Sequence, residues 1–164
     1  MQFRDYLNAV PQAAKEYEAL KVSLALACPE DAGREKYLAG KHAFIVRSLR
    51  TAAAWAFMGQ TVHIVIDRPV GYVHRAGGFE TVYPINYGYL PGVPGGDGEE
   101  LDVYLLGVNE PVTEADATVI GVVRRKNDAE DKLIAAPAGV TITKAQMEEA
   151  VRFQEQWFAS EVLC

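Results

Sequence analysis

The residue pattern changes abruptly near Gln60, and this change limits the folds open to the chain. Residues 1–57 are rich in Ala, Leu, Glu and Lys, and apolar residues recur three and four positions apart, as at Tyr17, Leu20 and Leu24. This spacing is typical of amphipathic helices. We therefore expect a helical hairpin over residues 1–57.

The second helix of this hairpin is expected to begin after Asp31, a suitable N-cap. Its apolar stripe is expected to comprise Leu38, Ile45, Leu49 and Ala52. A lone histidine, His42, falls on the same helix and is interpreted as an ordinary helix residue.

Short β-branched segments replace the helical pattern after Gln60. They are separated by Gly, Pro and Asp and cover residues 61–69, 82–90, 101–107, 117–125 and 131–137. Five strands in so short a span favour a small barrel over alternating strands and helices. Thr143 and Gln146 then form a capping-box pattern that begins a C-terminal helix. The expected fold is α+β, with domains 1–57 and 58–164.

Composition excludes several classes of function. A net charge of −6 argues against nucleic acid as a partner, because no basic excess is available for phosphates. The N-terminus lacks an apolar signal-peptide region, and no segment approaches the about 18 apolar residues of a membrane helix. Two cysteines, Cys28 and Cys164, are too few for a disulfide framework. These features predict a soluble, cytoplasmic protein without a membrane partner.

Residues 97–102 place several carboxylates around the start of a strand. Asp97 lies in a glycine-rich loop, Glu99 follows it, and Asp102 faces away from the apolar side formed by Leu101 and Val103. Carboxylates that converge in this way repel each other unless a cation joins them, and Mg²⁺ prefers such oxygen ligands. The alternative is a plain Asp-Gly hairpin turn with a solvated acidic rim.

Neighbouring residues favour a site for a phosphorylated ligand. Tyr83, Tyr87 and Tyr89 project to one side if their segment is extended, and the cations Arg75 and Lys132 flank the acidic stretch. A further acidic segment precedes Lys132 and contains Asp128, Glu130 and Asp131. Carboxylates, a metal and interleaved cations are the groups that phosphoanhydride chemistry requires. The alternative for residues 127–132 is an exposed polar turn.

The segments "YPINYGYLPG", "DGEELDVYLLG" and "DKLIAAP" resemble the soluble, Mg²⁺-dependent inorganic pyrophosphatases over residues 61–161. The resemblance implies a five-stranded, OB-like closed barrel and Mg²⁺ as cofactor, with Mn²⁺ as an alternative ion. It implies that Glu99 helps to activate the attacking water, that Tyr87 lies beside that water, and that Arg75 and Lys132 bind phosphate, with Tyr83 also on the substrate side. The implied metal ligands are Asp67, Asp97, Asp102, Asp128, Glu130 and Asp131.

This sequence also departs from the family pattern. Glu99 stands where the family has aspartate, and the segment after Pro69 lacks the family's lysine and glutamate. Trp157 and Phe158 replace a tyrosine and a lysine near the C-terminus. The predicted function is therefore metal-dependent hydrolysis of pyrophosphate or a related phosphoanhydride. The alternative is a catalytically impaired module that binds a phosphorylated ligand or a protein.

Residues 1–57 resemble the C-terminal helices of GrpB-type proteins of the nucleotidyltransferase fold. The catalytic core of that fold is absent from this chain, so the resemblance implies no nucleotidyl transfer. We expect these helices to act as a packing or oligomerisation element. Because most soluble oligomers are symmetric, a homodimer or a higher homo-oligomer is expected.

Overall fold

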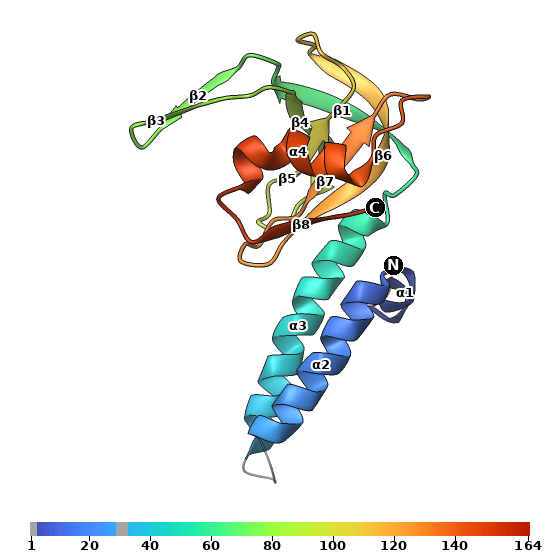
Figure 1. Ribbon diagram of the computed structural model, residues 1–164, viewed down its shortest axis with the longest axis vertical. Helices are drawn as coiled ribbons and strands as arrows, with labels where there is room; N and C mark the ends of the chain where they lie inside the picture. The colour runs from blue at the N-terminus through green and yellow to red at the C-terminus, as the bar shows by residue number, and fades with distance from the viewer. Residues whose placement is uncertain (1–2, 29–32) are drawn as a thin grey trace. The chain divides into compact units, whose positions relative to one another are not determined.

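The computed structural model describes residues 3–28 and 33–164 (Figure 1). Asp31, the expected helix cap, lies outside the described residues. The chain divides into two compact units, residues 1–56 and 57–164, which we describe separately. Among the helices in the described part of the chain, none combines the length and hydrophobicity that a membrane crossing requires.

The first unit consists of three helices, α1 (Phe3–Ala9), α2 (Pro11–Ala27) and α3 (Arg34–Trp55). Aromatic rings join all three helices. The rings of Tyr17 and Phe44 stack with centroids 5.3 Å apart, and the ring of Phe3 meets the ring of Tyr17 edge to face, also at 5.3 Å. Such pairs add stability beyond the area they bury.

The predicted stripe of the second helix is confirmed only in part, because Ala52 is buried but two of its leucines are not. Leu38 and Leu49 are exposed by 53% and 43%, whereas Phe44 and Ser48 are buried. A Cβ atom added at Gly40 would lie 2.7 Å from the side chain of Leu24 on α2, so the two helices approach closely at this glycine. The buried face therefore follows the close approach at Gly40 and the stacking of Phe44, and it includes Ala52 but not the two leucines.

The second unit contains a six-stranded sheet in the order β1-β4-β5-β7-β6-β8. Because β1 also pairs with β6, the pairings return to their starting strand and form a ring. A separate two-stranded ribbon of β2 and β3 extends from this sheet (Figure 1). The strands are β1 (Thr61–Arg68), β2 (Val73–Ala76), β3 (Phe79–Val82), β4 (Asn86–Pro94), β5 (Glu100–Leu105), β6 (Glu114–Arg125), β7 (Lys132–Ala136) and β8 (Ser160–Leu163).

The five predicted strand segments correspond to β1, β4, β5, β6 and β7. The C-terminal helix α4 (Lys144–Glu155) begins with the predicted capping box, in which the Gln146 side chain accepts a hydrogen bond from the Thr143 backbone N–H at 2.8 Å. This helix ends at Glu155, and residues 160–163 pair with β6 as β8. The strands β2, β3 and β8 were not predicted.

One pairing in the sheet is parallel and brings the two acidic segments to the same edge. Strands β5 and β7 run in the same direction, with Val103 opposite Leu133. Their beginnings therefore lie together, and each follows one of the acidic loops, residues 95–99 and 126–131. This juxtaposition positions the pocket described below.

Two glycines permit close backbone approaches around that edge. A Cβ atom at Gly88, between Tyr87 and Tyr89, would lie 1.9 Å from the Val65 carbonyl oxygen on β1. A Cβ atom at Gly96 would lie 1.9 Å from the Ala129 carbonyl oxygen, so the two acidic loops touch at Gly96. Any larger residue at either position would force the backbones apart.

Candidate functional site

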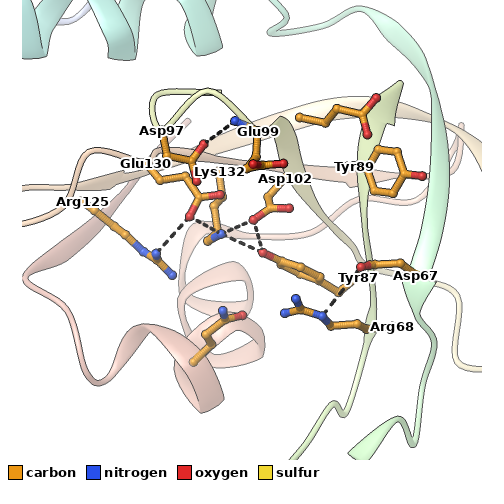
Figure 2. A pocket seen from close by; sticks show the side chains of 12 residues that line it. Asp67, Arg68, Tyr87, Tyr89, Asp97, Glu99, Asp102, Arg125, Glu130 and Lys132 are labelled. Carbon is orange, nitrogen blue, oxygen red and sulfur yellow. Dashed lines mark hydrogen bonds and ion pairs between the residues drawn. The ribbon is translucent and has the colours of Figure 1, made fainter. Parts of the chain in front are cut away.

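A polar pocket of about 420 Å³ lies where β1, β4, β5 and β7 meet the two acidic loops (Figure 2). Six carboxylates and three cations line it, together with two tyrosines and one glutamine. The lining residues are Asp67, Arg68, Tyr87, Tyr89, Asp97, Glu99, Glu100, Asp102, Arg125, Glu130, Lys132 and Gln154.

Lys132, the first residue of β7, is at the centre of a buried hydrogen-bonded cluster. Its ammonium group donates to the Tyr87 hydroxyl at 2.7 Å and to Glu130 Oε2 at 2.8 Å, and it also contacts Asp102 Oδ2. Its side chain is 2% exposed. Burial of an ammonium group is tolerated here because two carboxylates and a hydroxyl surround it.

Tyr87 is held as a protonated hydrogen-bond donor. Its hydroxyl accepts from Lys132 and donates to Asp102 Oδ2 (Figure 2). Burial, followed by the negative charge of Asp102, raises the pKa of Tyr87 far above its ordinary value. The proton on this hydroxyl therefore stays in place throughout the physiological pH range, and Tyr87 acts as a fixed dipole that points at Asp102.

Asp102 and Glu130 behave as a coupled pair. Burial, together with the hydrogen bond to Asp102, raises the pKa of Glu130 to about 7 against the opposing effect of Lys132. For Asp102, burial acts in the same direction, but the Glu130 hydrogen bond and the Lys132 charge outweigh it and lower its pKa. We assign the shared proton to Glu130, because Asp102 receives the additional hydrogen bond from Tyr87.

Deprotonation of Glu130 should lower the free energy of unfolding as pH rises. Its pKa is higher in the folded chain, at about 7, than the ordinary 4.5. Its stabilising effect is therefore complete below pH 4.5 and is lost as pH rises through 7. In metal-free buffer, we expect the ionisation of Glu130 to remove about 1–3 kcal/mol of unfolding free energy across that range.

Urea unfolding at several pH values measures this slope for the wild type and for Glu130→Gln, which should lack it. Glu149→Gln serves as the matched control, since Glu149 is exposed on α4 and pairs only with Arg152 among the described residues. An unchanged pH slope in Glu130→Gln would contradict the assignment of the shared proton.

Arg125, the last residue of β6, organises the acidic loop that follows it. Its side chain is 3% exposed and makes two hydrogen bonds to Glu155 of α4, at 2.7 and 3.0 Å. Its Nη1 contacts Asp128 at 3.0 Å and Glu130 at 3.5 Å, while its backbone N–H donates to Asp131 at 3.0 Å. The loop is thus tied to both β6 and α4.

Seven of the sequence-predicted site residues line the pocket. They are Asp67, Tyr87, Asp97, Glu99, Asp102, Glu130 and Lys132. Asp97 and Glu99 belong to one tight turn, in which the Glu99 backbone N–H donates to Asp97 Oδ1 at 3.0 Å. Burial, and then the charge of Asp102, raise the pKa of Asp67, while Arg68 opposes the rise.

Four other predicted residues do not line this pocket. Arg75 is on the ribbon and pairs with Glu80 at 2.9 Å. Tyr83 is buried and packs edge to face against Tyr87 and Phe153. Asp128 and Asp131 accept hydrogen bonds from Arg125.

Sequence reasoning missed Arg68, Glu100, Arg125 and Gln154 as pocket residues. Arg68 could have been found, because it directly follows Asp67 in "VIDRP". Its Nη1 donates to the Tyr83 hydroxyl at 2.6 Å, and its guanidinium lies over the rings of Tyr83 and Tyr87. No comparable signal in the sequence marks Arg125 or Gln154.

The acidic side chains of the pocket offer carboxylate oxygens, which are the type of ligand that a hard divalent cation prefers. Within residues 3–28 and 33–164, however, no three such side chains are close enough together to form a ready ligand group. Two of the candidates, Asp102 and Glu130, contact the Lys132 ammonium instead. An ion that used them would share them with Lys132.

Comparison with known proteins connects the two units to different families. Residues 59–160 match the model of the inorganic pyrophosphatase family, and residues 1–51 match the model of the GrpB protein family. No curated protein matches the chain.

Several solved structures are similar to this one. An inorganic pyrophosphatase from Neisseria gonorrhoeae has 21% identity and a TM-score of 0.44, with 58% of this chain and 72% of that chain covered. One from Ehrlichia chaffeensis has 17% identity and a TM-score of 0.49, covering 65% and 86%. One from Helicobacter pylori has 20% identity and a TM-score of 0.46, covering 63% and 82%.

Proposed function

Since the chain belongs to the inorganic pyrophosphatase family through residues 59–160, we propose that it hydrolyses inorganic pyrophosphate, or a closely related phosphoanhydride, in the pocket around Lys132. In this reaction a water oxygen bonds to one phosphorus, the bridging P–O bond breaks, and two phosphate ions result. The observation that carries the proposal is the buried Lys132 cluster inside a rim of carboxylates.

The cations of the pocket would bind the negatively charged oxygens of a pyrophosphate substrate. Lys132 is positioned to hold a phosphate oxygen, and Tyr87 fixes the ammonium by accepting one of its hydrogen bonds at 2.7 Å. A preorganised positive group of this kind stabilises charge that develops in the transition state. Substrate oxygens would replace part of the carboxylate contact that Lys132 makes in the free protein.

Mg²⁺, with Mn²⁺ as an alternative, is the cofactor that we propose. Asp67, Asp97, Asp102 and Glu130 are the residues that would hold it, whereas Asp128 and Asp131 already accept hydrogen bonds from Arg125. When bound, such an ion neutralises phosphate oxygens and lowers the pKa of water.

Glu99 is the proposed acceptor of the proton that the attacking water releases. Its carboxylate lines the pocket, while its backbone is held in the turn by Asp97. Compared with an aspartate, a glutamate places its carboxylate one methylene further from that backbone.

The proposal also covers the shape of the second unit, the role of the N-terminal helices and the location of the protein. We describe residues 58–164 as an OB-like closed barrel, supported by the ring of pairings that the β1–β6 ladder completes. We assign residues 1–57 to packing or to assembly of a homodimer or a higher homo-oligomer. A cytoplasmic location is consistent with two free cysteines, Cys28 and Cys164.

Phosphate release from pyrophosphate, measured with Mg²⁺, with Mn²⁺ and with EDTA, tests this function. We expect turnover with either ion and none with EDTA. Asp102→Asn should lower kcat/KM by about 10²–10³-fold, in line with the loss of one preorganised group. Asp116→Asn is the matched control, because Asp116 is exposed and pairs with His63 outside the pocket.

Two results would count against hydrolysis. Turnover that Asp102→Asn leaves intact would remove this pocket as the site. A wild-type protein that binds a non-hydrolysable diphosphate but releases no phosphate would be the phosphate-binding module that the sequence also allows.

A further inference from the structure

We propose that Arg68, and not Arg75, is the arginine that binds a phosphate group of the substrate. The inference rests on the proposed function, because it takes the ligand to be a phosphoanhydride. It assigns a role to a residue of β1 that the family resemblance did not suggest.

A bulge in β1 directs Arg68 toward the pocket. Ile66 pairs with Gly88 on β4, so a regular antiparallel ladder would place Arg68 opposite Asn86. The register shifts after Ile66, and Arg68 pairs with Tyr87 instead. Bulges commonly redirect a side chain next to a functional site.

Aromatic contacts then hold the Arg68 guanidinium in place. It lies 5.4 Å from the ring centroid of Tyr83 and 5.2 Å from that of Tyr87, and Nη1 donates to the Tyr83 hydroxyl at 2.6 Å. Figure 2 shows it beneath the Tyr87 ring, within the same pocket as Lys132. A planar guanidinium fixed in this way loses little side-chain entropy when it binds an anion.

Arg68 also retains hydrogen-bonding capacity that the other pocket cations have already used. Its nearest carboxylate is that of Asp67, 3.8 Å from Nε, which is too far for a hydrogen bond. Among the described residues, its side-chain hydrogen bond goes to Tyr83 alone. By contrast, Lys132 contacts two carboxylates and Arg125 contacts three.

Arg75 lacks these features. It lies on β2 of the separate ribbon, its side chain is 73% exposed, and its Nε donates to Glu80 at 2.9 Å. The hollow beside it is formed by the ribbon itself, with Gly77 and Gly78 at the turn. Arg68 therefore supplies the second cationic contact that a diphosphate needs beside Lys132.

Binding of a methylene-bridged diphosphate, measured by calorimetry with Mg²⁺ present, tests the proposal without requiring turnover. Arg68→Gln should weaken binding by about 10–100-fold, as expected for lost hydrogen bonds to a charged group. Arg68→Lys should weaken binding less, and Arg75→Gln, the matched control, should change it less than about twofold. Thermal unfolding confirms that each variant is folded.

Phosphate release from pyrophosphate by the same proteins separates this inference from the proposed function. Arg68→Gln should raise KM, and added guanidinium should partly restore kcat/KM in Arg68→Ala. If the wild type binds the diphosphate without hydrolysing it and Arg68→Gln loses binding, Arg68 retains its role and the hydrolase proposal fails.

Three outcomes overturn the Arg68 proposal. The first is a wild type that hydrolyses pyrophosphate while Arg68→Gln binds and turns over normally. The second is a larger loss in Arg75→Gln than in Arg68→Gln. The third is a wild type that neither binds the diphosphate nor hydrolyses pyrophosphate, which overturns the proposed function as well.

Discussion

Replacing Lys132 with methionine should abolish hydrolysis and destabilise the folded chain by about 3–5 kcal/mol at pH 8. Methionine keeps much of the side-chain volume but removes the ammonium group that contacts Asp102, Glu130 and Tyr87. The two half-buried carboxylates would then repel each other without compensation. We expect kcat/KM to fall by at least about 10³-fold, because substrate binding and local geometry are lost together.

The pH dependence of this destabilisation distinguishes charge from packing. Without Lys132, the folded-state pKa of Glu130 should rise further above its ordinary 4.5, and the pKa of Asp102 should lose the lowering that the Lys132 charge contributes. The variant would then lose stability as pH rises, so its deficit should be smaller at pH 5 than at pH 8. Urea unfolding at both pH values tests this expectation. Lys144→Met, at an exposed α4 position, should lie within about 0.5 kcal/mol of the wild type at both. A deficit that does not change with pH would indicate a packing defect.

Replacing Arg125 with methionine should also lower stability by about 3–5 kcal/mol. This arginine is the common partner of Glu155, Asp128 and Glu130, and its loss leaves Glu155 buried without its cation. Chemical denaturation provides the measurement. Arg152→Met is the matched control, since Arg152 is exposed and pairs with Glu149 on the same helix.

A double variant tests whether the lost stability comes from the unpaired charge of Glu155 or from lost packing. The Arg125→Met variant leaves the Glu155 charge buried and unpaired. Adding Glu155→Leu removes that charge, so much of the lost stability should return. Pairs in direct contact show such non-additive effects. If the two substitutions were simply additive, the Arg125–Glu155 contact would not be the source of the stability.

The strands of the sheet and half of the pocket could be predicted because their signals are local. Alternating apolar residues mark β1 and β5, a continuous apolar run marks β7, and the turn around Asp97 follows from its glycines. The parallel pairing of β5 with β7 brings Asp97 and Lys132 to one edge of the sheet. The family resemblance implied that these two residues share a site, although no local pattern predicts the pairing.

The remaining features depend on pairings that no local pattern records. The bulge that directs Arg68 exists only when β1 lies against β4. Residues 160–163 form a strand because β6 offers them a free edge, not because of their own propensity. In the same way, the approach at Gly40 determines the buried face of α3.

The parallel β5–β7 ladder also has a consequence for the order in which the protein matures. The segment from β4 to β5 carries Tyr87 and Asp102, and the β6–β7 hairpin carries Arg125 and Lys132. Each hairpin can form from near neighbours in sequence, but the ladder between them must close a loop of about 30 residues. A nascent chain that holds only the first hairpin has acidic groups without their lysine. We therefore expect the pocket to form in a late step of folding, so that binding of the proposed ligand would report completion of the sheet.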